Sequence, residues 1–134
     1  MIRNIINGVR GYIDYRGGAG HLAFVMHRIS GLGTLAFLSM HILLESTAHF
    51  APHLYDTLNA GLRHPAALVM EITMAFLVIF HGVNGYRIAY FDLFNTRNWS
   101  HPAGQQSARA TWIISILLWL PSLVIMVLHS LDLL

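Results

Sequence analysis

The sequence predicts an all-α membrane protein with three transmembrane helices. Of its 134 residues, 55% are hydrophobic and only 10% are charged, and the mean hydropathy is +0.55. Soluble globular proteins carry about a quarter charged residues. Three apolar stretches reach the ~20 residues that a helix needs to cross about 30 Å of hydrocarbon. These are His21–Glu45, Ala66–Phe94 and Ala110–Leu134. We expect them to form a single membrane-anchor domain over residues 1–134.

The arginine residues predict the orientation of the helices. All eight cationic side chains are arginine. Arg3, Arg10 and Arg16 precede the first helix, Arg87, Arg97 and Arg109 lie at or within the second loop, and the first loop has only Arg63. Because cytoplasmic loops carry the excess of basic residues, we expect a cytoplasmic N-terminus and an external C-terminus. No stretch before residue 22 resembles a cleaved signal peptide, so the first helix is expected to direct its own insertion.

The segment between the first two helices is expected to form a short surface helix. In Pro52–Leu62 the apolar positions are Leu54, Tyr55, Leu58 and Leu62, which is the spacing of one helical face. The net charge of +2 is too small to indicate nucleic-acid binding, so the lipid bilayer is the expected environment.

Histidine is the candidate metal ligand of this chain, because cysteine is absent. At 100° and 1.5 Å per residue, His27 and His41 share one face of the first helix and lie about 21 Å apart in depth. Each helix has one face of small or polar residues, which lets a flat cofactor or another helix approach closely. These faces are His27, Gly31, Thr34, Leu38, His41 and Glu45; Met74, Val78, His81, Gly85, Ile88 and Asp92; and Ser115, Trp119, Ser122, Met126 and His129.

Imidazoles that project into a helix bundle at fixed depths are what a buried haem requires, since its iron takes axial histidines. His81 lies about 15 to 20 Å from the cytoplasmic end of its helix. It is the predicted ligand, with a hydrogen-bonded packing histidine as the alternative. His41 lies roughly 10 Å from His81 in depth, so both cannot easily bind one iron. The two histidines therefore indicate either two haems or one haem and a histidine that binds none. Water or Glu45 would otherwise satisfy His41, and His129 is interpreted as interfacial.

Arg28, next to His27 at the cytoplasmic start of the first helix, forms a second candidate site. A guanidinium there can pair with a haem propionate or donate to a carbonyl oxygen, and it stays charged at any relevant pH. The alternative is that Arg28 extends to lipid headgroups. Arg87 and Asp92 lie near the same boundary, where a local ion pair or contact with headgroups is an equal alternative.

Two strings resemble the cytochrome b556 membrane anchor family of succinate dehydrogenase. They are HRISG, from His27 to Gly31, and H-x-x-x-G-x-R-x-x-x-x-D, from His81 to Asp92. The resemblance covers all three spans and implies the N-in orientation. SMHILLE, from Ser39 to Glu45, is similar to the end of the first helix in two-haem anchors, where a histidine binds the distal haem.

The resemblance implies a set of site residues. For cofactor binding these are His27, Arg28, Ser30, His41, His81, Gly85 and Arg87; for quinone, Phe24, His27, Arg28 and Asp92; and as metal ligands, His41 and His81. The chain departs from the family at Phe24, where a serine is usual, and at Tyr86, Arg87 and Ile88, where the family commonly has an aliphatic residue followed by Arg-His. No catalytic residue is expected in this chain alone.

The implied function is that of a membrane anchor and haem b subunit of succinate:quinone oxidoreductase. It would work with a second anchor, an iron–sulfur and a flavoprotein subunit in the bacterial plasma membrane. One haem b is expected and a second is open, with quinone as the substrate. Without cysteine, this chain cannot hold an iron–sulfur cluster by thiolates. A haem b anchor of fumarate reductase or another respiratory complex shares these arguments, and a non-redox membrane scaffold is the third interpretation.

Overall fold

The computed structural model describes residues 6–8, 11, 18–62, 64–96 and 101–131, and in this part of the chain the regular structure is helical. The four helices that carry the fold are α2 (Gly18–Phe50), α3 (Pro52–Leu62), α4 (Pro65–Phe94) and α5 (His101–Ser130). Three of them, α2, α4 and α5, are long and apolar enough to cross a membrane. The predicted fold class of an all-α protein with three transmembrane helices is therefore confirmed.

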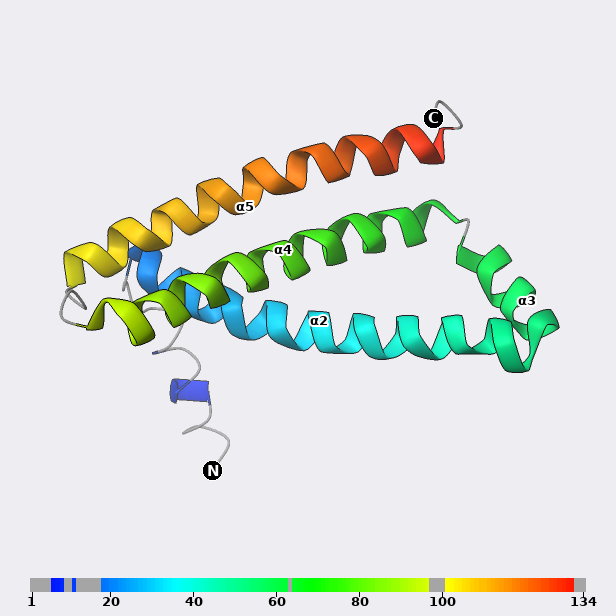
Figure 1. The fold of residues 1–134 in the computed structure, drawn as a ribbon, viewed down its shortest axis with the longest axis horizontal. Coiled ribbons are helices and arrows are strands. Elements are labelled where there is room, and N and C mark those ends of the chain that lie inside the picture. The colour runs from blue at the N-terminus through cyan, green and yellow to red at the C-terminus, as the bar shows by residue number, and fades with distance from the viewer. Residues whose placement is uncertain (1–5, 9–10, 12–17, 63, 97–100, 132–134) are drawn as a thin grey trace.

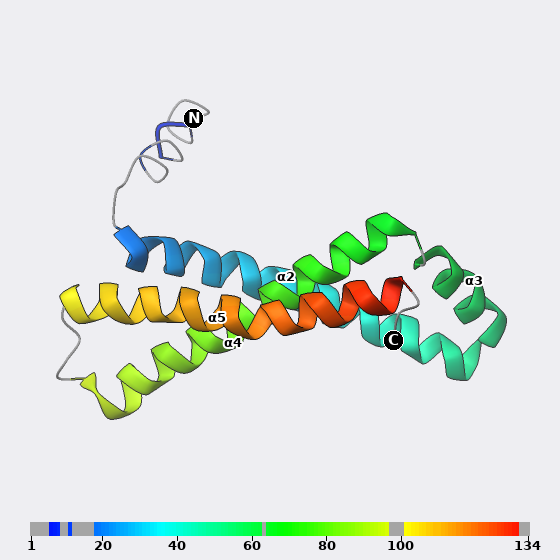
Figure 2. The same cartoon turned by 90° about the horizontal axis from the view of Figure 1, so that it is seen from above.

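The short helix α3 turns the chain between α2 and α4. One residue, Ala51, separates α2 from α3. Pro52 starts α3 and Pro65 starts α4, where a missing backbone N–H costs no helical hydrogen bond. The side chain of His64 caps α4 by accepting from the Ala66 N–H at 3.2 Å. In Figures 1 and 2, α3 lies at one end of the molecule, across the direction of the long helices.

The transmembrane helices are longer than their apolar cores. α2 starts three residues before the predicted limit and ends five residues after it. In the added C-terminal turn, the Ser46 and Thr47 hydroxyls donate to carbonyls of the same helix. α5 starts at His101, nine residues before the predicted limit. The predicted limit was based on hydropathy alone, which misses the polar first turns of α5. These turns are attached to α2 by a hydrogen bond, in which the Gln105 Oε1 accepts from the Gly20 N–H at 3.1 Å.

The three long helices pack around a small core in which α4 contacts both of the others. Ala23, Phe80 and Ala108 are fully buried, one from each helix, with Trp112 packed beside them. Further along, the Trp119 indole donates to the Ile72 carbonyl oxygen at 3.0 Å and ties α5 to α4. α2 and α4 run antiparallel, and Figure 1 shows them diverging toward α3.

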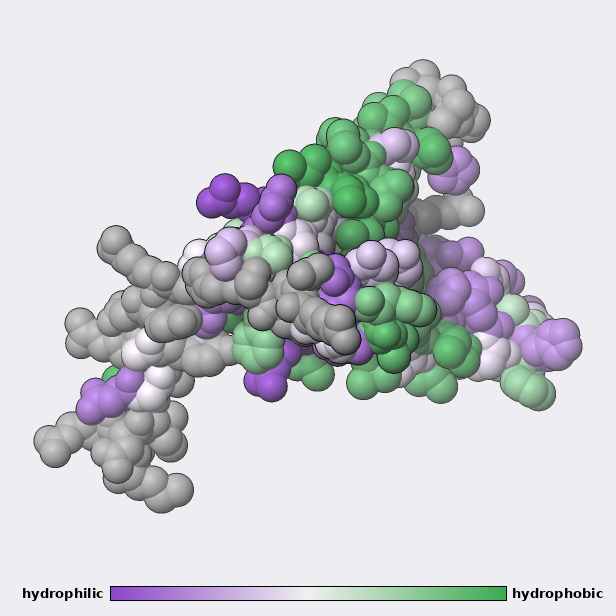
Figure 3. All heavy atoms as spheres, turned by 60° about the vertical axis from the view of Figure 1, so that its left-hand side comes forward, coloured by the Kyte–Doolittle hydropathy of each residue, from purple (hydrophilic) through white to green (hydrophobic). Residues whose placement is uncertain are grey.

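Most large apolar side chains point outward. Leu32 is 70% exposed and Leu117 is 61% exposed, and Figure 3 shows broad hydrophobic areas on one face of the bundle. Such a surface requires lipid or another apolar partner. The arginines on which the predicted orientation chiefly depends lie outside the described residues: Arg3, Arg10, Arg16, Arg63 and Arg97. The cytoplasmic N-terminus therefore stays a prediction.

Candidate cofactor site at the histidine pair

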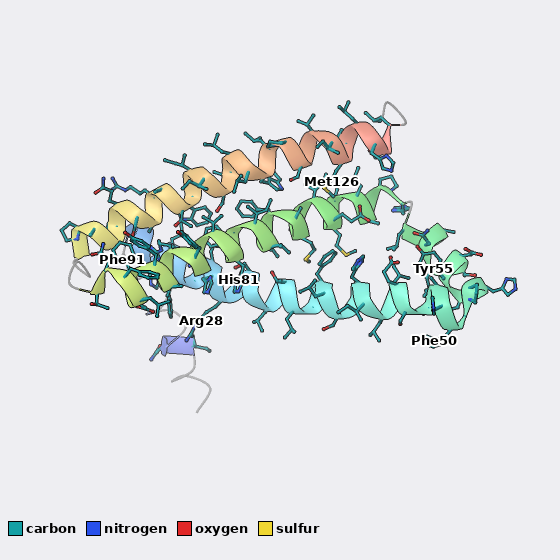
Figure 4. The ribbon with its side chains drawn as sticks, in the orientation of Figure 1. Arg28, Phe50, Tyr55, His81, Phe91 and Met126 are labelled. Atoms are coloured by element: carbon teal, nitrogen blue, oxygen red, sulfur yellow. The ribbon has the colours of Figure 1, made fainter. Side chains whose placement is uncertain are left out.

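His27 of α2 and His81 of α4 form one site. Their imidazole rings are stacked, with centroids 4.2 Å apart and planes 3° from parallel. These residues were predicted to belong to two separate candidate sites, and the structure brings them to one level of the bundle. Figure 4 shows His81 on α4 at the side that faces α2.

Two glycines make the close approach of the rings feasible. A Cβ atom on Gly31 would lie 2.9 Å from His81 Cε1, and one on Gly85 would lie 3.6 Å from His27 Cε1. Each histidine is followed four residues later by one of these glycines, on the same helical face. Because α2 and α4 are antiparallel, each ring lies over the other helix's glycine. The repeated His-x-x-x-Gly spacing is the sequence signal that places each histidine and its glycine on one helical face.

His81 is held by hydrogen bonds at one ring nitrogen. Its Nδ1 lies 3.2 Å from the His27 carbonyl oxygen and 3.4 Å from the Ser30 hydroxyl, and Ser30 itself is fully buried. A carbonyl oxygen only accepts, so this network assigns the proton to Nδ1 and leaves the lone pair on Nε2. Metal-binding histidines characteristically have this arrangement, in which the second nitrogen donates to a carbonyl and fixes the ring.

The stacking also limits what His27 does. Two imidazoles on opposite sides of one iron have nitrogens about 4 Å apart, twice the ~2 Å bond, and their rings extend away from each other. Face-to-face rings with centroids 4.2 Å apart do not have that geometry. In this arrangement His27 and His81 therefore do not serve as the two axial ligands of one iron.

The residues around His81 fit a haem ligand better than a chelated metal ion. Among the described residues, no three or more His, Asp or Glu side chains come together as a metal site. A haem iron needs only axial ligands from the protein. His81 offers Nε2 for this purpose, while the absence of a side chain at Gly31 makes room for its ring.

The predicted quinone residues Phe24, His27, Arg28 and Asp92 do not lie together, and Arg87, which was predicted for cofactor binding, lies apart from Phe24 and Arg28. Arg28 lies over the ring of Phe24, with its guanidinium carbon 4.7 Å from the ring centroid, and both side chains are exposed on α2. His27 instead faces α4. Asp92 is exposed in the last turn of α4, and Arg87 donates to the Gly104 carbonyl oxygen at 3.4 Å. Phe24 and Arg28 are thus available to another subunit.

His41 lies outside the histidine pair, at a cavity of about 840 Å³ between the diverging helices. Its exposed ring stacks on Phe37, with centroids 5.7 Å apart. All four described helices contribute to the cavity wall, which is largely apolar; besides His41 it includes Leu58 of α3, Glu71 of α4 and Met126 of α5. A cavity of this size takes a drug-sized or cofactor-sized ligand.

Several buried polar residues were missed as site residues. Asn84 and Ser115 are fully buried and Thr111 is 2% exposed, although all three lie in membrane-spanning helices. Ser115 was expected on a face of small or polar residues of its helix, and Asn84 was not singled out. Helical spacing alone does not indicate the burial of either residue, because burial depends on how the third helix packs.

Residues 12–127 match the family described as succinate dehydrogenase/fumarate reductase transmembrane subunit. The chain belongs to this family. It is 32% identical over 118 residues to the succinate dehydrogenase 2 membrane subunit SdhC of Mycobacterium tuberculosis, covering 86% of this chain and 82% of that protein. It is 30% identical over 76 residues to the succinate dehydrogenase hydrophobic membrane anchor subunit of Halobacterium salinarum, covering 56% of this chain and 58% of that protein. The expected family is confirmed, and with it the role of a transmembrane subunit.

Proposed function

We propose that the chain is the haem b-binding membrane anchor of a succinate:quinone oxidoreductase in the bacterial plasma membrane. The observation that carries the proposal is the environment of His81, whose Nδ1 is hydrogen-bonded to a backbone carbonyl while Nε2 keeps its lone pair. Family membership supports the same assignment. A haem bound here would accept and return single electrons between the iron–sulfur subunit and quinone.

The residues of the chain have distinct parts in this proposal. His81 would hold the haem iron through Nε2, and Ser30 and the His27 carbonyl fix the orientation of its ring. Arg28 and Phe24 present a cation and an aromatic face to a neighbouring subunit, where Arg28 can donate to a quinone oxygen or a propionate. Near the same membrane boundary, Asp92 stays a candidate for quinone binding and Arg87 a candidate for cofactor binding.

The partners in this proposal are a second anchor, an iron–sulfur subunit and a flavoprotein subunit. The exposed apolar faces of the three helices suit the second anchor as well as lipid. The family description includes fumarate reductase, so a complex that reduces fumarate is the alternative. A second haem at His41 is part of the proposal, because the cavity beside that ring extends across all four described helices.

A reduced-minus-oxidised spectrum of the purified complex tests the proposal. The wild-type complex is expected to show a b-type alpha band, and His81→Ala should remove one haem or convert it to high spin. His49→Ala, at the exposed end of α2, is the matched control and should leave the spectrum unchanged. An unaltered low-spin spectrum in His81→Ala would refute the ligand assignment.

A further inference from the structure

Ser30 is a buried hydroxyl that lies against the histidine pair. Its side chain is 0% exposed, and its Oγ lies 3.0 Å from the His27 carbonyl oxygen and 3.4 Å from His81 Nδ1. The same Nδ1 lies 3.2 Å from the His27 carbonyl oxygen. Polar atoms of three residues, from α2 and α4, thus lie within hydrogen-bonding distance of one another. The surrounding hydrocarbon could not replace a hydrogen bond that was lost here.

The distances indicate where the single proton of the Ser30 hydroxyl lies. A serine has one O–H donor and two acceptor lone pairs, whereas a carbonyl oxygen can only accept. Donation to the His27 carbonyl, three residues earlier in α2, is the shorter of the two contacts open to the Ser30 O–H. Ser30 Oγ is then available as an acceptor for the N–H of His81. His81 Nδ1 therefore has two acceptors, one from the backbone and one from a side chain.

Two acceptors at Nδ1 favour the form of His81 that can bind iron. With the proton on Nδ1, both contacts are hydrogen bonds. With the proton on Nε2, the Nδ1 lone pair would face the His27 carbonyl oxygen, which is also an acceptor, at 3.2 Å. The network thus disfavours the tautomer whose Nε2 carries a hydrogen. A hydrogen bond at the second ring nitrogen also makes a metal-binding histidine more basic.

We propose that Ser30 is a positioning residue for the haem that His81 would hold, and that its hydroxyl lowers the midpoint potential of this haem. The proposal rests on the haem-binding role of His81 given above. Hydrogen bonds to an axial ligand are one means by which a protein sets the potential of a haem. A more basic ligand stabilises ferric over ferrous iron, which lowers the potential.

A second effect of the hydroxyl has the opposite sign. By donating to the His27 carbonyl, Ser30 makes this oxygen a weaker acceptor for His81 Nδ1. Such polarisation changes the strength of a hydrogen bond by about 10–30%. Removal of the hydroxyl takes away one of the two acceptors at Nδ1, which is the larger change. The midpoint potential should therefore rise when the hydroxyl is removed.

Ser46 provides a matched control within the same helix. Serines inside helices often donate to a carbonyl of the preceding turn, and this need alone could explain the bond of Ser30. The Ser46 hydroxyl donates to the Leu43 carbonyl at 2.7 Å, again three residues earlier, and has no histidine partner. Ser46→Ala removes the same kind of intrahelical bond. An effect that is confined to Ser30→Ala then arises from the contact with His81.

Potentiometric titration of the haem in the purified complex, followed by its reduced-minus-oxidised spectrum, tests the proposal. Ser30→Ala should keep a low-spin haem but raise the midpoint potential of the haem that His81→Ala removes. Ser30→Thr keeps a hydroxyl and should return the potential towards the wild-type value. Ser30→Cys, whose sulfur is a weak acceptor, should leave the potential raised. Ser46→Ala should leave it unchanged.

Two results would overturn the role of Ser30. One is a potential in Ser30→Ala that is equal to or below the wild-type value. The other is the same shift in Ser30→Ala and Ser46→Ala. If Ser30→Ala does not assemble, Ser30→Cys and Ser30→Thr decide, because equal potentials in these two variants would also refute the role. Failure of the proposed function is distinguishable, since His81→Ala would then keep the wild-type spectrum.

Discussion

Adding one methyl group at Gly31 is expected to disturb the histidine pair. The new Cβ would lie 2.9 Å from His81 Cε1, closer than a Cβ contact tolerates. The ring cannot easily move away, because it is stacked on His27 and bonded at Nδ1. Overpacking of this kind costs about 1–3 kcal/mol, and replacing a helical glycine by alanine returns up to ~1 kcal/mol. Gly31→Ala should therefore destabilise the protein by roughly 0–3 kcal/mol, from the difference of these two effects.

Two other glycines provide the matched controls. A Cβ on Gly33 would lie 2.6 Å from Leu77 Cδ1, which is an even shorter contact, but this atom is the tip of a flexible side chain. Leu77 can change rotamer, so Gly33→Ala should be nearly neutral. A Cβ on Gly82 meets nothing within 4 Å, so Gly82→Ala should be neutral or stabilising. The expected order of stability is Gly82→Ala, then Gly33→Ala, then Gly31→Ala.

The thermal unfolding midpoint of the purified complex, followed by tryptophan fluorescence, ranks the three variants. The haem difference spectrum should change in Gly31→Ala alone, because Gly31 alone of the three contacts a histidine ring. The reasoning is wrong if Gly31→Ala matches Gly82→Ala in both measurements. It is equally wrong if Gly33→Ala, with the shorter contact, is the more damaged variant.

Three further outcomes are expected. Arg28→Ala should lower quinone reduction strongly while succinate oxidation with a soluble dye survives, and Arg28→Lys should restore activity only in part because an ammonium lacks the planar fork; a parallel loss of both activities would indicate failed assembly. The ratio of haem to flavin should be near two and fall in His41→Ala, whereas a ratio near one that this variant does not change would leave His41 a packing residue. Trp119→Phe removes the hydrogen bond to the Ile72 carbonyl and should lower the free energy of unfolding by about 0.5–1.5 kcal/mol, measured by chemical denaturation. Trp112→Phe should cost less, because the buried Nε1 of Trp112 has no hydrogen-bond partner among the described residues. Equal losses of stability in the two variants would contradict this.

The transmembrane spans and the surface helix were predictable because hydropathy and helical period are properties of single segments. Pro52–Leu62 forms the expected helix with the expected bounds. The start of α5 was not predictable in the same way. Its first turns are polar, and they are helical in a context where Gln105 accepts from the backbone of α2. Such an interaction depends on two segments that are 85 residues apart in sequence.

The individual histidines of the candidate site were predictable, but their arrangement was not. The spacing within a helix places Gly31 on the face of His27 and Gly85 on the face of His81, as found. It does not say at which level two antiparallel helices meet, and a shift of one turn would separate the rings by about 5 Å. The level is set by packing at Gly31 and Gly33, where α4 side chains approach the α2 backbone. The burial of Asn84 similarly depends on the third helix.

The histidine pair leads to a conclusion about the larger complex. If His81 binds iron through Nε2, the opposite axial position requires another ligand for a low-spin haem. His27 is excluded by its stacking on His81, and His41 lies at another level, beside the cavity. The remaining histidines of the described transmembrane helices, His21, His49, His101 and His129, lie near helix ends. On the proposal that His81 holds a low-spin haem, we therefore expect the second ligand from a different subunit, and such a haem would lie where the two chains meet.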